Sequence, residues 1–547
     1  MPLPARLPSG RRPVSFSSGP SGRRRLRRGS WLPAILSALL LIAGFASYVA
    51  FYSAAPTEPG FHAQACWFDT DIVGDADCGT LVVRENRQRP DSRTIGLPIV
   101  ILRAQGEEAE RGRTREPIFY LTGGPGDRFP FSSQQDMDSW SLWRKDFPPE
   151  HDLILVGPRG TGRHAVDFGC PEMRKAAISA GAHRPGEPPP DSRALAVEAV
   201  TACARRLQSE GVDLTAYNSR ESAADIAELR QALEIETAVL YGVSYGTRWA
   251  LSILRYHPEG IAAAILDGLV PPEAAEGLEV AAFYRESLQQ VFDDCAAHSV
   301  CRHQFGDVER RYERLREGLK ARPLKLPLEN YLDGDELSAL GDAEGRSISF
   351  DDTWFGWLLF DAIMDRDVPF LIPLLIDDLE QKRFATLNAR LRESLLLILE
   401  SQAYNSWAIY LSHICRDEAA FETPEAVAAA ARTAGDLAFM VEDYAPNYLC
   451  ALWPSGKADP VENQPVRSAV PTLLLSGRFD PLTPPALAQR AAAHLSNSYL
   501  YTLAEKGHGA LYDNACAQHL VRSFLRSFKR PTQTRCEPQD LAVSAGN

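Results

Sequence analysis

Hydrophobic residues along the chain follow two alternating patterns. Eight short apolar or β-branched runs end at turn residues, which is typical of strands buried on both faces. These runs cover residues 79–84, 95–103, 117–121, 152–156, 237–241, 262–266, 471–475 and 498–503. Apolar positions recur at helical spacing between several of the runs, for example in residues 194–209, 223–233 and 245–255. The alternation predicts an α/β fold with a mostly parallel, eight-stranded sheet, and the first two runs predict an antiparallel hairpin at its edge.

The alternation stops after residue 268, and about 200 residues with helical periodicity follow. Helical patterns occupy residues 281–295, 355–364, 371–381 and 387–404. Strand patterns return only at residue 471, and a last helix is expected over 516–528. We therefore expect a helical cap over residues 271–470, inserted into a core made of residues 56–270 and 471–547.

The N-terminus predicts export. Residues 1–30 hold eight arginines and no acidic residue, and residues 31–52 are uncharged and apolar over a length that can cross a bilayer. We favour an uncleaved signal anchor with a cytoplasmic basic segment, because 22 apolar residues exceed the usual core of a signal peptide. The alternative is cleavage after Ala55 and secretion. Either route puts the remainder outside the cytoplasm, in a periplasmic or extracellular space.

Charge and composition narrow the function classes. The 45% hydrophobic and 24% charged content is ordinary globular usage and excludes collagen, coiled coil and wholesale disorder. Beyond the basic segment, 50 basic residues face 71 acidic ones, a net charge of −21. A body this acidic repels phosphate backbones, so nucleic acid is excluded as a partner.

Ten cysteines fit an oxidising compartment. Their positions suggest that near neighbours pair: Cys66 with Cys78, Cys170 with Cys203, Cys295 with Cys301, Cys415 with Cys450, and Cys516 with Cys536. No Cys-x-x-Cys occurs, which argues against a zinc ribbon or a thioredoxin-like site.

Ser244 is the predicted nucleophile. The strand at 237–241 runs into Gly-Val-Ser-Tyr-Gly at residues 242–246 and then into a helix. Small flanking residues allow the sharp strand-to-helix turn that lifts a serine hydroxyl above the sheet. G-x-S-x-G alone is weak evidence, but the strand before it and the helix after it make it specific.

A serine nucleophile needs an imidazole base and an acid that orients it, expected in the chain order Ser, Asp, His. Asp480 follows the strand at 471–475, and His508 follows the next strand, between two glycines. Asp267 also ends a predicted strand and is the rival acid. We expect Ser244, Asp480 and His508 to form the triad.

The oxyanion hole is expected at the loop after the third strand. Gly-Gly-Pro-Gly at residues 123–126 allows the backbone to approach a substrate oxygen closely. We expect the N–H groups of Gly124 and Tyr245 to donate to the oxyanion.

These motifs together resemble the α/β-hydrolase peptidases of the proline iminopeptidase and tripeptidyl aminopeptidase group. The resemblance rests on residues 123–126, 158–163, 242–247, 480–484 and 507–509, and residues 414–418 with Cys450 and 453–454 are similar to the C-terminal region of the tripeptidyl branch. It implies an α/β-hydrolase fold and cleavage of short peptides with a free N-terminus, without a metal or other cofactor.

The chain departs from this group at two positions. The group usually has His before Gly-Gly-Pro-Gly and Asp before its Arg-Gly motif, whereas this chain has Thr122 and the pair Gly157-Pro158. Thr122 alters the support expected for the oxyanion loop. The missing Asp removes an expected buried partner of Arg159.

An aminopeptidase must bind an ammonium group, and carboxylates from the cap are the means that physical chemistry offers. Glu418, with Asp417, is the candidate because both lie in the segment similar to the tripeptidyl branch. A solvated surface position is the competing interpretation of this acidic pair.

Three function hypotheses remain open. The first is a membrane-anchored serine exopeptidase acting on peptides with a free N-terminus. The second is an esterase or lipase with the same triad, since only the cap decides the pocket. The third is a non-catalytic binding protein on a hydrolase scaffold.

Overall fold

The computed structural model describes residues 57–532, except 113, 127–130, 162–165, 167, 184–189, 340–344, 365–367, 384–387 and 393–405. The chain divides into two units, Met1–Ala55 and Pro56–Asn547. The predicted basic segment and apolar segment of residues 1–52 lie outside the described residues. Among the residues that are described, no helix combines the length and the apolar character that a bilayer crossing requires.

A nine-stranded sheet forms the core, with the strand order β1-β2-β3-β5-β4-β7-β8-β11-β12. Pairing is antiparallel from β1 to β5 and parallel from β5 to β12. Its strands are β1 (Gly60–Gln64), β2 (Ala76–Arg84), β3 (Thr94–Leu102), β4 (Arg115–Leu121), β5 (His151–Val156), β7 (Ala238–Val243), β8 (Ile261–Asp267), β11 (Thr472–Gly477) and β12 (Ser498–Leu503). The predicted α/β-hydrolase architecture is confirmed.

The predicted number of strands is wrong by one, because β1 was missed. This strand has the sequence Gly-Phe-His-Ala-Gln and lies at the edge of the sheet, paired only with β2. An edge strand is partly exposed and needs no apolar run, so its sequence carries little signal. The edge expected at the hairpin of β2 and β3 is therefore covered.

Helices pack on both faces of the sheet. One face holds α3 (Gln134–Trp143) and α20 (Ala515–Leu525), and the other holds α6 (Ser219–Ala232), α7 (Tyr245–Tyr256) and α19 (Pro485–Ala492). The central strands β7 and β11 are buried along their whole length. Burial on both faces explains why these strands have continuous apolar runs.

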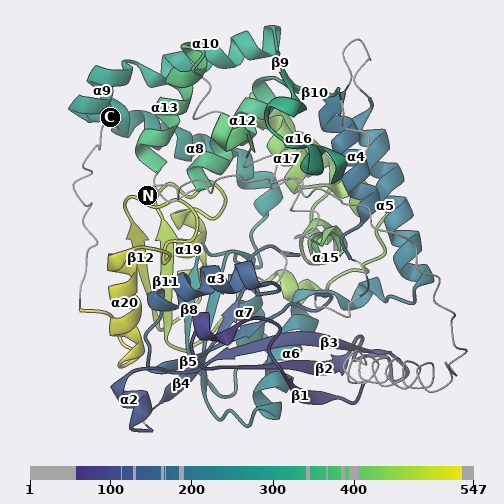
Figure 1. Cartoon of the computed structure of the whole chain (residues 1–547), viewed down its shortest axis with the longest axis vertical. Coiled ribbons are helices and arrows are strands. Elements are labelled where there is room, and N and C mark those ends of the chain that lie inside the picture. Colours follow the sequence, from purple (N-terminus) through teal and green to yellow (C-terminus); the bar gives the residue numbers. More distant parts are fainter. Residues whose placement is uncertain are drawn as a thin grey trace, which may run out of the picture. The chain divides into compact units, whose positions relative to one another are not determined.

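The segment between β8 and β11 is largely helical and gathers on one side of the sheet (Figure 1). Its helices are α8 (Glu276–Ala297), α9 (Ser299–Phe305), α10 (Val308–Ala321), α11 (Gly334–Ala339), α12 (Asp352–Met364), α13 (Val368–Glu380), α15 (Trp407–His413), α16 (Pro424–Ala434), α17 (Ala438–Tyr444) and α18 (Asn447–Cys450). A separate apolar core joins several of them. The helix expected over 387–404 falls mostly outside the described residues.

Part of the predicted core also packs with the cap. A small antiparallel sheet joins β6 (Ala182–His183) to β10 (Ser347–Phe350) and β9 (Leu324–Pro327). Strand β6 connects α4 (Pro171–Gly181) toward α5 (Ser192–Ser209), which Figure 1 shows beside the cap helices. Because β6 pairs with β10 and α5 contacts α18, this segment of the predicted core packs against the cap.

Candidate active site

Ser244 lies at the turn between β7 and α7 with φ 54° and ψ −127°. Residues other than glycine seldom adopt this backbone conformation, and such strain concentrates at functional sites. The backbone N–H of Ser244 donates a 2.9 Å hydrogen bond to the carbonyl oxygen of Asp267, which ends the neighbouring strand β8. The sharp turn expected from the sequence is present, and it is tied to the adjacent strand.

The glycines on either side of Ser244 are required by close packing. A Cβ at Gly242 would lie 2.3 Å from the carbonyl oxygen of Gly246. A Cβ at Gly246 would lie 2.1 Å from the carbonyl oxygen of Leu121 and 2.8 Å from that of Thr122. Only glycine allows α7 to start this close to the end of β4.

Asp480 and His508 meet on the loops that follow β11 and β12. His508 Nδ1 donates a 2.8 Å hydrogen bond to Asp480 Oδ2. The Asp480 side chain is fully buried, whereas His508 keeps 14% of its side chain exposed. An orienting carboxylate behind a partly accessible imidazole is the arrangement that general-base catalysis needs.

Asp480 accepts further hydrogen bonds that sequence reasoning did not predict. Thr483 donates to it twice, from its backbone N–H to Oδ1 at 2.8 Å and from Oγ1 to Oδ2 at 2.6 Å. Thr483 Oγ1 also lies 3.0 Å from His508 Nδ1. Burial alone would raise the pKa of Asp480, but the charge of His508 and the hydrogen bonds from His508 and Thr483 outweigh burial and hold this pKa below its usual value. Asp480 therefore stays ionised beside the imidazole.

Gly124 and Ser244 follow two neighbouring strands, β4 and β7, at which the order of the strands reverses. From β4 the chain continues to β5 on one side, and from β7 it continues to β8 on the other side, so the loops after β4 and β7 diverge. Ligands of α/β sheets bind in the crevice that forms at such a point. Gly124 follows β4, with φ 111°, and Tyr245 follows Ser244. Gly124, Ser244 and Tyr245 all line one cavity.

This cavity has a volume of about 490 Å³ and lies between the sheet and the cap. Most of its walls are apolar or aromatic, which suits a small organic ligand. The apolar wall residues include Met173, Trp357, Trp407, Tyr410, Leu411, Ile414, Tyr444 and Leu482. Four carboxyl groups also line it: Glu276, Glu418, Glu442 and Asp443.

Glu276 and Glu418 influence each other's charge within this cavity. Burial first, and then the negative charge of Glu418, raise the pKa of Glu276 well above its ordinary value. Burial also raises the pKa of Glu418, against the opposing charge of Arg248, whose Nη1 donates to Glu418 Oε1 at 3.0 Å. Glu276 was not predicted, because nothing local in the sequence shows that the start of α8 faces residues of the π-helical turn Ile414–Glu418.

Asp417 lies apart from the cavity lining and has structural partners. Its Oδ2 accepts hydrogen bonds from the Ser219 backbone N–H at 2.9 Å and from Ser219 Oγ at 2.7 Å, and its Oδ1 accepts one from Arg416 Nη1 at 2.7 Å. Burial alone would raise the pKa of Asp417, but the charge of Arg416 outweighs it, so this pKa is lowered. Asp417 thus joins the segment that carries Glu418 to α6.

Arg159 has a buried partner even though the Asp expected before it is missing. The fully buried Asp225, on α6, accepts hydrogen bonds from Arg159 Nε at 2.8 Å and from Nη2 at 2.7 Å. Arg159 Nη1 donates to the carbonyl oxygens of Glu85 and Ala216. The expected loss of a partner is therefore wrong, because α6 supplies the carboxylate.

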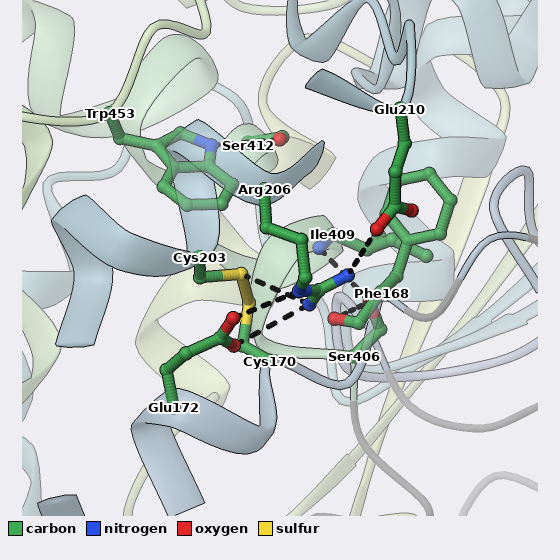
Figure 2. The surroundings of a disulfide bond; sticks show 10 residues. All are labelled: Phe168, Cys170, Glu172, Cys203, Arg206, Glu210, Ser406, Ile409, Ser412 and Trp453. Carbon is green, nitrogen blue, oxygen red and sulfur yellow. Dashed lines mark hydrogen bonds and ion pairs between the residues drawn. A yellow bond between two sulfur atoms is a disulfide. The ribbon is translucent and has the colours of Figure 1, made fainter. Parts of the chain in front are cut away.

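Four of the five predicted disulfides are confirmed: Cys66–Cys78, Cys170–Cys203, Cys295–Cys301 and Cys415–Cys450. Cys516 is also disulfide-bonded, and Cys536 lies outside the described residues. Figure 2 shows Cys170–Cys203, which joins the start of α4 to α5, with Arg206 and Glu172 beside it. Glu172 and these two sulfur atoms are the one cluster of metal-ligand type found in the described part of the chain, and sulfurs bonded to each other offer no thiolate to a metal.

Comparison with known proteins finds a family match in the C-terminal part. Residues 438–536 match the family described as TAP-like protein. The serine protease Hip1 of Mycobacterium tuberculosis, like that of Mycobacterium bovis, is 24% identical over 241 residues, which cover 42% of this chain and 43% of the relative. The chain therefore matches less than half the length of these curated relatives.

Solved structures resemble the chain at lower identity. A thermophilic esterase from Thermogutta terrifontis is 15% identical, with a TM-score of 0.33, over 82% of this chain and 98% of that one. An esterase from Exiguobacterium antarcticum is 15% identical, with a TM-score of 0.30, over 79% of this chain and 97% of that one.

Proposed function

We propose that this chain, an α/β hydrolase with a TAP-like C-terminal region, is a serine peptidase that removes residues or short peptides from a free N-terminus. The observation that carries the proposal is that Ser244 and the carboxyl groups of Glu276 and Glu418 line one cavity. A nucleophile and an ammonium-binding group must share a pocket for exo-acting cleavage. The similarity to serine protease Hip1 supports the peptidase class.

The chemistry proceeds through an acyl-enzyme. His508 accepts the proton of Ser244 as the hydroxyl attacks the carbonyl carbon, and Asp480 stabilises the imidazolium that forms. The backbone N–H groups of Gly124 and Tyr245 stabilise the oxyanion of the tetrahedral intermediate. His508 then protonates the leaving amine, and a water molecule, activated by the same imidazole, releases the acyl group.

Recognition of the free N-terminus falls to Glu418 with Glu276. An ammonium group between two carboxyl groups relieves their mutual repulsion and favours their ionised forms, which burial opposes. Arg248 fixes one oxygen of Glu418, and Asp417 acts indirectly by anchoring the turn that carries Glu418. Peptides with a free N-terminus are thus the proposed partners.

Hydrolysis of esters is the second candidate function. The apolar wall formed by Trp357, Trp407 and Leu411 also suits the acyl or alkyl group of an ester. A non-catalytic binding role is disfavoured, because the Ser244 turn keeps its strain and the Asp480–His508 pair keeps its hydrogen bond.

Catalysis is proposed to take place outside the cytoplasm. The disulfides are consistent with an oxidising space. We propose that residues 31–52 anchor the chain in the membrane, with secretion after cleavage near Ala55 as the alternative.

The test compares matched substrates on the full, detergent-solubilised chain. Chromogenic di- and tripeptides are offered with free and acetylated N-termini beside a p-nitrophenyl ester, with Ser244→Ala as control. Cleavage of free-amine peptides that acetylation abolishes supports the proposal. Ester turnover without peptide cleavage identifies an esterase, and activity that survives in Ser244→Ala rejects the catalytic serine.

A further inference from the structure

A second buried carboxyl group holds the loop that carries His508. Asp267 ends β8 and is completely buried. Its Oδ1 accepts a 2.7 Å hydrogen bond from the backbone N–H of Ala510, and its Oδ2 accepts one of 2.8 Å from that of Leu511. The side chain of Asp267, which is not one of the three predicted triad residues, thus fixes the backbone just after His508.

The same residue also fixes the nucleophile. Its backbone carbonyl accepts the 2.9 Å hydrogen bond from Ser244 N–H. The His508 ring lies against the next residue, since a Cβ at Gly268 would be 3.2 Å from His508 Cε1 and 3.4 Å from Nδ1. Asp267 therefore contacts the two segments whose relative position decides whether the imidazole can accept the serine proton.

Titratable groups face Asp267 from two parts of the chain. His508 and Tyr512 face it from the loop after β12, and Tyr241 faces it from β7. Tyr241 donates to Asp267 Oδ2 at 3.2 Å, and Tyr120 and Tyr512 join through their hydroxyls at 2.5 Å. Burial raises the pKa of Tyr241 and of Tyr512 well above the ordinary value, so both hydroxyls are neutral near pH 7.

We propose that Asp267 is a positioning residue for His508: it holds the histidine loop against the Ser244 turn, and its negative charge stabilises the imidazolium formed during catalysis. The proposal rests on the proposed serine hydrolysis. Asp480 keeps its separate role, because it accepts the hydrogen bond from Nδ1. Two carboxylates then act on the imidazole of His508. Asp480 accepts a hydrogen bond from its ring, and Asp267 holds the backbone that follows it and acts on the ring through its negative charge.

Ionisation of Asp267 must accompany this role. Burial is the largest effect and raises the pKa of Asp267 to about 6, although the backbone N–H groups of Leu511 and Ala510 and the charge of His508 oppose it. The group is therefore mostly ionised at pH 7 and gains its proton around pH 6. Protonation of Asp267 thus contributes to the acid side of the pH profile, together with protonation of the imidazole.

The first test is Asp267→Asn in the full chain, assayed on a p-nitrophenyl ester so that recognition of an N-terminus does not enter. We expect kcat to fall roughly tenfold or more, as for loss of a charge-assisted hydrogen bond, with KM within about twofold of the parent value. The acid limb of kcat/KM should move to lower pH, because removing a negative charge lowers the pKa of His508. An unchanged kcat and an unmoved limb would overturn the proposal.

The second variant, Tyr241→Phe, keeps the charge and both backbone hydrogen bonds. It removes a donor that favours the ionised carboxylate, so the pKa of Asp267 should rise and the acid limb should move to higher pH, opposite to Asp267→Asn. If Asp267 had a purely structural role, Tyr241→Phe would leave the acid limb of kcat/KM in place. That result would overturn the proposal even if Asp267→Asn fails to fold. Ester activity that persists in Ser244→Ala would instead reject the proposed function.

Discussion

Thr483 donates its hydroxyl hydrogen bond to Asp480 Oδ2, the oxygen that also accepts from His508 Nδ1, at 2.6 and 2.8 Å. One carboxylate oxygen is therefore shared by Thr483 and the imidazole of His508. We predict that Thr483→Val, which preserves shape but removes the hydroxyl, lowers kcat about tenfold and changes KM little, because a lost hydrogen bond to a charged group costs about 1.5 kcal/mol or more. Steady-state kinetics on an ester measure both parameters.

The control for this variant is Thr483→Ser, which keeps the hydroxyl and the backbone hydrogen bond. Recovery of most of the parent kcat in Thr483→Ser would show that the hydroxyl matters rather than the side-chain volume. Equal kcat values for Thr483→Val and the parent would contradict the prediction.

The paired carboxyl groups of the cavity predict a pH dependence of substrate binding. Because burial raises the pKa of Glu276 and Glu418, these groups take up protons at a higher pH than ordinary carboxyl groups do. A protonated carboxyl group binds ammonium weakly, so KM for free-amine peptides should rise as the pH is lowered. KM for an uncharged ester should not follow this rise, and initial rates on both substrates across the pH range test the difference.

Glu418→Gln is the matching substitution. We expect KM for free-amine peptides to rise about tenfold, with ester kcat/KM retained, because the glutamine keeps the shape and loses the charge. The matched control is Glu425→Gln, an exposed position at the start of α16 that lies outside the lining of the cavity. Equal losses on peptide and ester would mean that Glu418 supports the fold rather than the ammonium group.

Most of the strands that the sequence revealed are buried on both faces. All eight predicted runs are strands of the sheet, and the central ones are apolar throughout because helices cover both of their sides. The edge strand β12 was also found, although it is only partly buried, because its run is rich in leucine and tyrosine. The sequence did not predict four further strands, because they are short, partly exposed, or paired with residues far away in the sequence: β1, β6, β9 and β10. Pairing between distant segments leaves no local pattern to find.

The candidate site divides in the same way. Ser244 and His508 lie in local glycine motifs, so their surroundings could be predicted from a few neighbouring residues. Glu276 could not, because it lines the cavity together with residues that lie far from it in the sequence, such as Ser244 and Glu418. The same holds for Asp225, the partner of Arg159, because it lies on α6 and nothing in the Arg-Gly motif points to a residue of that helix.

The buried ion pair between Arg159 and Asp225 predicts a large loss of stability when one partner is neutralised. Both side chains are completely buried, and Asp225 Oδ1 also accepts from Arg87 Nη2 at 2.6 Å. Asp225→Asn removes the negative charge that Arg159 and Arg87 share. Because a buried charge without its partner is costly, we expect the free energy of unfolding to fall by about 3–5 kcal/mol. Denaturation followed by circular dichroism measures it.

Glu228→Gln provides the comparison, because Glu228 belongs to the same helix and pairs with the same Arg87 at 2.7 Å but is 43% exposed. A solvent-exposed pair contributes less than about 1 kcal/mol. Similar losses in Asp225→Asn and Glu228→Gln would contradict the claim that burial makes the difference.

We predict that Gly246→Ala lowers both the stability of the fold and the rate of catalysis. A Cβ at Gly246 would lie 2.1 Å from the Leu121 carbonyl oxygen, and this atom is backbone, which cannot rotate away. Gly246→Ala should therefore push α7 from the end of β4, separating Ser244 from the loop of Gly124. We expect about 3 kcal/mol less stability and a fall in kcat of the folded fraction, because the overlap must be relieved by backbone movement.

The control for Gly246→Ala is a second glycine inside a helix. Gly318 lies in α10 on the exposed side, and a Cβ there would have no atom within 4 Å. Gly318→Ala should raise stability by about 0.5–1 kcal/mol, since alanine loses less conformational freedom than glycine on folding. Opposite signs for the two Gly→Ala changes, measured in one thermal and chemical denaturation series, would show that the contact with β4 decides the outcome. A harmless Gly246→Ala would mean that the turn at Ser244 tolerates a wider gap from β4 than the structure has.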